Sequence, residues 1–257
     1  MDETLPAAWV ALGLFGGMLL FLELGRRLGA RRQARGLSSA GHSAVDGAIF
    51  ALFGLLVAFT FSGAASRWDV RRMNIADEAN VIGTAYLRLD LLAAEDQPPQ
   101  RQLFRDYLDA RIQVYSSLPD RVAALAAHGR ATALQTTIWK SLMPALRNAS
   151  AHVDAAKLLV PAVNEMFDMM TTRTMAARTH PATVIFILLF LLGFGCALLA
   201  GYAMAGARSW SWLHAATFAF FIAAGTYVIL DIEYPRAGFF RLTTYDQVLV
   251  DLRHSMQ

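Results

Sequence analysis

The residues best suited to chemistry in this sequence are charged groups at the ends of long apolar stretches. Asp231 and Glu233 close the last of these stretches and stand two residues apart. Carboxylates in this position can bind a cation, can latch this last apolar stretch to the polar insert at residues 67–180, or can simply be hydrated at a membrane surface. All three interpretations stay open on the residues alone.

Motifs for catalysis are missing from the sequence. It contains no glycine-rich phosphate loop, no G-x-S-x-G elbow and no H-E-x-x-H zinc motif. The six histidines are scattered without the spacing of metal ligands, and no nucleophile is paired with a base. We therefore expect no enzyme and no metal site built from the histidines, and these motifs indicate no cofactor.

A second group of charges lies at helical spacing in the middle of the chain. Asp77 and Glu78 follow Arg71, Arg72 and Asn74 by three to seven residues. Side chains three or four residues apart on a helix are neighbours. Ion pairs within one helix, or between subunits, are therefore expected here rather than acid–base catalysis.

Composition places the elements that carry these groups in a membrane. Apolar residues make up 56% of the 257 residues and charged residues 17%, and the mean hydropathy is +0.38. Soluble globular chains contain about 45–50% apolar and about 25% charged residues. Four stretches lack Asp, Glu, Lys and Arg over roughly 20 residues or more, which is enough to cross a bilayer as a helix. They are residues 4–22, 47–66, 181–207 and 209–230.

The predicted fold is all-α, with four transmembrane helices and a helical extramembrane bundle inserted between the second and the third. The predicted divisions are a hairpin at 1–66 with spans at about 5–25 and 45–66, the bundle at 67–180, a second hairpin at 181–230 with spans at about 182–204 and 211–230, and a tail at 231–257 with a short amphipathic helix. The second helix is expected to continue past the membrane to about residue 92. Within the bundle, one helix is expected to stop at Gly129 and the last to begin at Pro161.

Basic residues gather between the first two spans. They are Arg26, Arg27, Arg31, Arg32 and Arg35. This cluster is typical of a topology signal that also attracts anionic lipid, and by the positive-inside rule it would be cytoplasmic. No aromatic residue accompanies it, so binding of nucleic acid is not expected.

The second span carries a stripe at four-residue steps. Ala51, Leu55 and Phe59 form it, and Ser62 and Ser66 continue it. Because the opposite side of this helix is also apolar, packing against lipid or another subunit is one interpretation. If several copies surrounded an axis, the stripe would instead form a dry constriction that gates by dewetting.

Three arginines come directly after this stripe. Arg67, Arg71 and Arg72 are expected to flank such a pore as charged rings. Rings of positive charge would raise the local concentration of anions.

Several segments resemble a known family. Residues 62–71 (SGAASRWDVR) resemble the end of the second membrane helix of bestrophins, and residues 232–238 (IEYPRAG) resemble the turn after their fourth helix. Three more segments resemble the signature of bacterial bestrophin-like membrane proteins: 59–64 (FTFSGA), 78–90 (EANVIGTAYLRLD) and 246–252 (DQVLVDL). The order of two spans, a helical insert and two spans is also that of bestrophins, so the chain is identified as a member of the bacterial bestrophin-like family.

The resemblance implies a homopentameric ion channel in the bacterial inner membrane, with the bilayer and small ions as its other partners. It implies a pore along the second helix, with a neck at Phe59, Leu55 and Ala51 and Ser62 beside it. The small Ala51 departs from the family pattern and widens or removes the third ring. The bestrophin layout also places the insert and both termini in the cytoplasm, opposite to what the linker arginines indicate. On this layout the insert is predicted to be cytoplasmic.

Calcium is the one cofactor that the resemblance brings in. Bestrophins bind it through an acidic run after the fourth helix, whereas here only Asp231 and Glu233 are present, so gating by calcium is not expected. The alternative function is a non-conducting signalling or scaffold protein whose insert acts as a sensor-like domain.

Overall fold

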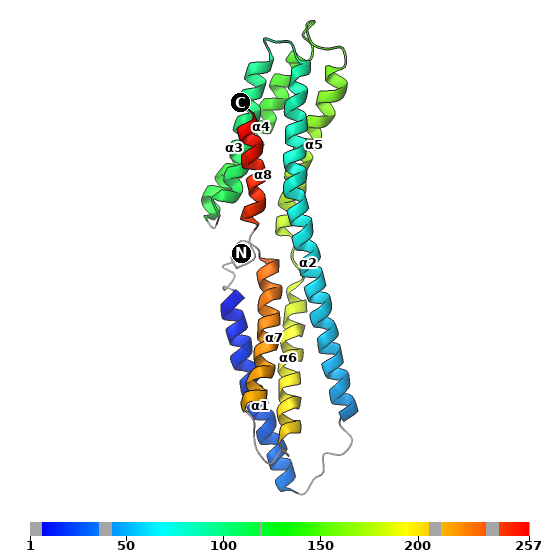
Figure 1. The fold of residues 1–257 in the computed structure, drawn as a ribbon, viewed down its shortest axis with the longest axis vertical. Helices are drawn as coiled ribbons and strands as arrows, with labels where there is room; N and C mark the ends of the chain where they lie inside the picture. The colour runs from blue at the N-terminus through cyan, green and yellow to red at the C-terminus, as the bar shows by residue number, and fades with distance from the viewer. Residues whose placement is uncertain (1–6, 36–42, 119, 206–211, 235–241, 257) are drawn as a thin grey trace. The chain divides into compact units, whose positions relative to one another are not determined.

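The computed structural model describes residues 7–35, 43–118, 120–205, 212–234 and 242–256. Of these residues, 89% are helical and none lies in a strand. The elements are α1 (Ala7–Ala34), α2 (Ser43–Leu87), the 3₁₀ turn η1 (Arg88–Leu91), α3 (Gln97–Ser116), α4 (Arg121–Ala145), α5 (Ala155–Arg178), α6 (Thr183–Met204), α7 (Trp212–Glu233) and α8 (Thr243–Ser255) (Figure 1). Four helical segments are long and apolar enough to cross a membrane, within Ala7–Ala34, Ala44–Leu91, Ala155–Met204 and Trp212–Glu233. The prediction of an all-α protein with four transmembrane helices is confirmed.

The chain forms two compact units. The membrane unit comprises residues 1–67 and 180–239, and the bundle unit comprises residues 68–179 and 240–257. Helix α2 is continuous to Leu87 and contributes its first part to the membrane unit and its second part to the bundle unit. Residues 235–238 of the predicted turn after the fourth span lie outside the described residues.

Glycines bring α1 and α6 into direct backbone contact in the membrane unit. A Cβ added to Gly201 of α6 would lie 1.9 Å from the carbonyl oxygen of Leu22. A Cβ added to Gly25 of α1 would lie 2.0 Å from the carbonyl oxygen of Leu198. Lipid supplies no hydrophobic drive between helices, so close contact of this kind is what holds them together.

Alanines pack α7 in the same unit, where it contacts α1. Ala215, Ala219 and Ala223 are buried at four-residue steps along α7. Leu14 and Met18 of α1 belong to the same buried cluster as the first two of these alanines. Small side chains on one helix therefore receive large ones from the other.

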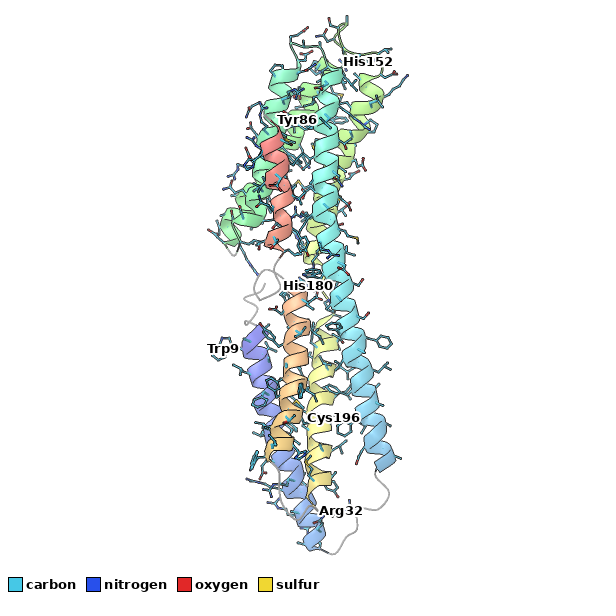
Figure 2. All side chains as sticks on the ribbon, in the orientation of Figure 1. Trp9, Arg32, Tyr86, His152, His180 and Cys196 are labelled. Atoms are coloured by element: carbon cyan, nitrogen blue, oxygen red, sulfur yellow. The ribbon has the colours of Figure 1, made fainter. Side chains whose placement is uncertain are left out.

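Two side chains labelled in Figure 2 mark the inside and the outside of the membrane unit. Cys196 on α6 is fully buried, whereas Trp9 on α1 projects outward and is 64% exposed. Indole side chains are enriched at the surfaces of the bilayer, where one end is apolar and the other is wet. The position of Trp9 therefore suits a helix that crosses lipid.

The bundle unit has an apolar core of its own. Ile82, Phe104, Ile138 and Val163 bring α2, α3, α4 and α5 into one buried cluster. Helix α8 adds Leu249 to this cluster and packs on α3. Pro98 and Pro99 stand in the first turn of α3, where the missing backbone N–H of a proline is not needed.

Two predicted helix boundaries in the bundle are wrong. Helix α4 continues through Gly129, and α5 begins at Ala155 with Pro161 inside it. The buried Ala127 and Ala131 stand on either side of the glycine. Burial of this face outweighs the cost of about 1 kcal/mol that a glycine adds to a helix interior.

Candidate functional site

One face of α2 is left uncovered by the rest of the protomer. Leu55 and Phe59 are 53% and 66% exposed, and Ala51 and Ser62 are exposed as well. Phe53, on the opposite side of the same turns, is buried. The four residues predicted to form a pore neck therefore share a face that lipid or another copy of the chain must cover.

Arg67 turns away from this face and forms an ion pair with Glu233 of α7. Its Nε and Nη2 donate to Glu233 Oε2 over 2.9 and 2.7 Å. The Glu233 side chain is completely buried, and the His180 Nδ1 lies 2.9 Å from its Oε1. The His180 ring, labelled in Figure 2, stacks on Tyr234 with 4.7 Å between ring centroids. These contacts give Glu233 the geometry of a latch within the membrane unit.

Asp231 is also buried in α7. Its exposed fraction is 1%. Within the described ranges, no group of three or more His, Cys, Asp or Glu is arranged to hold a metal ion. A cation site on Asp231 and Glu233 therefore stays a prediction.

Arg71 is buried in the bundle unit and caps the end of α5. Its Nε donates to the carbonyl oxygen of Ala176 over 3.1 Å, and its Nη2 donates to that of Thr179 over 2.8 Å. The last carbonyls of a helix have no partner within it and attract positive charge. The guanidinium of Arg71 is therefore held by hydrogen bonds within its own chain.

Arg72 lies against two aromatic rings. Its guanidinium carbon is 5.2 Å from the centroid of the Trp68 ring and 5.6 Å from that of Tyr245. Its Nη2 also lies 3.1 Å from Asp69 Oδ1. A cation over an aromatic face is stabilised by the ring quadrupole, which fixes Arg72 beside α8.

The three arginines predicted to flank a pore are therefore not brought together with the exposed stripe. An α-helix turns about 100° per residue, so Arg67 lies about 80° around α2 from Phe59. Arg71 falls still closer to the buried side. The helical spacing of these residues already indicates that the arginines and the stripe lie on different sides of α2. The sequence prediction considered only how close the arginines are to the stripe along the chain.

A buried charge network in the bundle unit was not predicted. Glu78 is fully buried. Its Oε1 accepts a hydrogen bond from Arg111 Nε over 2.5 Å, and its Oε2 accepts one from Arg173 Nη1. Arg173 also pairs through Nη2 with Asp246 of α8. Arg111 Nη2 donates to the Tyr115 hydroxyl over 3.2 Å. Glu78 therefore joins α2 to α3 and α5, and Arg173 extends the network to α8.

Comparison with known proteins identifies the family. A family model for the bestrophin-like domain matches residues 8–245. The chain belongs to the bestrophin-like family. The fold of this bestrophin-like chain is similar to the crystal structure of a single-substitution variant of a bacterial bestrophin homologue from Klebsiella pneumoniae, with a TM-score of 0.64 over 95% of this chain and 98% of that chain. The two chains are 14% identical, so this likeness concerns the fold. No curated protein matches the bestrophin-like chain significantly.

The charges of the network shift the pKa values of its members. Burial lowers the pKa of Arg111, but the charge and hydrogen bond of Glu78, together with Tyr115 and Tyr107, outweigh burial and raise that pKa above its ordinary value. Burial raises the pKa of the neighbouring Tyr107. In the bestrophin-like chain, Arg111 therefore stays cationic and Tyr107 stays neutral at physiological pH.

The ion-pair partners of Glu78 differ from those predicted from the sequence. Pairing within α2 or between subunits was expected, but Arg111 and Arg173 lie 33 and 95 residues further along the same chain. Only the tertiary fold of the bestrophin-like chain brings these residues together.

We predict that calcium leaves the thermal stability of the bestrophin-like chain unchanged. The Glu233 oxygens already face Arg67 and His180, and a ligand stabilises a fold only if it binds the folded state. The midpoint of thermal unfolding, Tm, should be the same in calcium chloride as in EDTA. Potassium chloride at matched ionic strength is the control. A Tm that rises and saturates with calcium would contradict the prediction.

Proposed function

We propose that this bestrophin-like chain forms an ion channel, as a homopentamer with α2 lining the pore and with Ala51, Leu55, Phe59 and Ser62 at the neck. Its place is the bacterial inner membrane, with the bundle unit in the cytoplasm. Its ligands are small ions, and Glu233 serves as a latch rather than as a calcium ligand. The family and the uncovered face of α2 support this function.

One observation carries the proposal. Ser62 and Ser66 are exposed on the same face of α2 as Phe59, inside a predicted membrane span. Polar side chains in such spans usually face the interior of a protein assembly or a water-filled cavity, because lipid offers them no hydrogen-bond partners. A face that combines exposed aromatic and hydroxyl side chains fits an axis lined by several copies better than it fits lipid alone.

The side chains of this face suggest how such a pathway would be gated. Rings of Leu55 and Phe59 would make an apolar constriction that empties of water when narrow. The methyl group of Ala51 would leave more room one turn away. The narrowest and driest point is therefore expected at Phe59.

The direct test is the current carried by purified protein in planar lipid bilayers. We expect wild-type protein to pass current and Phe59→Ala to increase it severalfold, because the change removes the aromatic ring from the constriction. Phe61→Ala is the matched control, since Phe61 is 44% exposed but lies off the stripe on the same helix. Its current should equal that of wild type.

Three results would count against this proposal. Absence of current from both wild type and Phe59→Ala would favour the non-conducting signalling or scaffold function. A monomer in detergent and in lipid would remove the axis on which the pore depends. Equal increases in Phe59→Ala and Phe61→Ala would show that the stripe does not line the pathway.

A further inference from the structure

The outer face of α1 changes along its length from apolar to cationic. It consists of five exposed residues at steps of three or four: Leu20, Leu24, Leu28, Arg31 and Arg35, which directly follows the helix. Residues at such steps lie on one side of an α-helix. The opposite side of α1 carries the glycines that contact the α6 backbone. The outer face is therefore left uncovered within the membrane unit.

Three other arginines at this end of α1 are held inside the membrane unit. Arg26 and Arg27 each donate to Glu23 over 2.7 Å. The guanidinium carbon of Arg32 lies 6.0 Å from the centroid of the Tyr202 ring on α6, which is within range of a cation–π contact. The charge of these three side chains is thus directed toward groups of the same chain.

The two arginines of the outer face differ from these three. The guanidinium groups of Arg31 and Arg35 have no ion-pair or hydrogen-bond partner among the described residues. Glu23 is the only acidic residue between 7 and 35, and it already accepts from two other arginines. The outer face therefore ends in two uncompensated positive charges, which a negatively charged partner would complement.

The length of α1 places these arginines at the surface of a bilayer. Trp9 stands eleven residues before Leu20, which is close to three turns, so it lies at the other end of the outer face. Arg31 follows Trp9 by 22 residues, or about 33 Å along a helix, and the hydrocarbon core of a bilayer is about 30 Å thick. Trp9 and Arg32, both labelled in Figure 2, mark the two ends of this distance. With Trp9 in one interface, Arg31 and Arg35 lie among the head groups of the other leaflet.

We infer that the outer face of α1 binds a phospholipid with a negatively charged head group. The head group pairs with Arg31 and Arg35, and the acyl chains lie along the three leucines. Basic side chains at the end of a membrane helix attract anionic lipid in this way. A second copy of the same face is a poorer occupant, because it would bring like charges together. The inference does not depend on whether the chain conducts ions.

The test is native mass spectrometry of the purified full chain in an equal mixture of phosphatidylglycerol and phosphatidylcholine. Wild type should retain phosphatidylglycerol in clear preference. Arg31→Gln with Arg35→Gln should lower the ratio of the two bound lipids roughly tenfold, because each basic residue near the head groups strengthens binding severalfold. Arg31→Lys with Arg35→Lys should keep most of the preference, since it keeps the charge. Lys140→Gln with Arg147→Gln is the matched control: it removes two exposed positive charges from the bundle unit and should leave the ratio unchanged.

Each contrary result would overturn the inference. A wild type that retains both lipids equally, or neither, would show that the outer face takes no anionic lipid, and the second case is expected if another copy covers it. A preference that survives the double glutamine substitution, or that falls equally in the control or in the lysine variant, would show that the charges of Arg31 and Arg35 do not hold the lipid. Displacement of phosphatidylglycerol by an excess of inorganic phosphate would show that the site takes free phosphate and has no need of the acyl chains.

Discussion

Replacement of Glu78 by glutamine is expected to lower the free energy of unfolding by about 3–5 kcal/mol. The substitution keeps the shape of the side chain but removes a negative charge that is fully buried between Arg111 and Arg173. Arg173 would keep Asp246, while Arg111 would keep only the Tyr115 hydroxyl. A guanidinium left buried without a counter-charge is among the most destabilising changes that one substitution can produce.

The measurement is unfolding of the full chain in detergent, followed by circular dichroism. Glu165→Gln is the matched control, because Glu165 is exposed on α5, and a change there should stay within about 0.5 kcal/mol. Joint replacement of Glu78 and Arg111 by methionine should cost less than the sum of the two single replacements, because it leaves no unpaired charge from that pair. Equal stability of Glu78→Gln and wild type would show that the network contributes nothing to the fold.

Addition of one methyl group at Gly201 is expected to separate α1 from α6. The Cβ of an alanine at this position would lie 1.9 Å from the Leu22 carbonyl oxygen, and the next two nearest atoms also belong to the Leu22 backbone. A backbone cannot swing aside as the end of a flexible side chain can. Gly201→Ala should therefore cost about 1–3 kcal/mol or more through overpacking.

The control for Gly201→Ala lies on the same helix. A Cβ at Gly195 would meet nothing within 4 Å, so Gly195→Ala should be neutral or should stabilise α6 by up to about 1 kcal/mol through helix propensity. Thermal unfolding and the yield of monodisperse protein measure both variants. A Gly201→Ala variant as stable as Gly195→Ala would mean that α1 and α6 do not touch at these glycines.

The layout of this protein could be predicted because hydropathy is a property of consecutive residues. Four uncharged stretches of sufficient length indicate four spans with no knowledge of tertiary contacts. The ends of the helices are less predictable. Helix α1 extends to Ala34, well past the apolar residues that predict it, because charged residues such as Arg26 and Arg27 are compatible with a helix and pair there with Glu23.

The candidate site could be predicted only in part, because it depends on which side of α2 is covered. The spacing of Leu55 and Phe59 indicates a stripe, but both sides of the span are apolar, so the uncovered side follows only from the packing of the protomer. The roles of Asp77 and Glu78 show the same limit. They are adjacent in sequence and identical in charge, yet one is exposed and the other is enclosed by two arginines.

The single cysteine has a practical consequence for work on this molecule. Cys196 on α6 is the only thiol in the chain and is fully buried. Reagents that label exposed thiols should therefore leave the native protein almost unlabelled. A cysteine introduced at Leu55 would then accept a nitroxide with little background. Dipolar coupling between nitroxides on neighbouring copies would report the spacing of α2 around any shared axis, with every native residue except Leu55 in place.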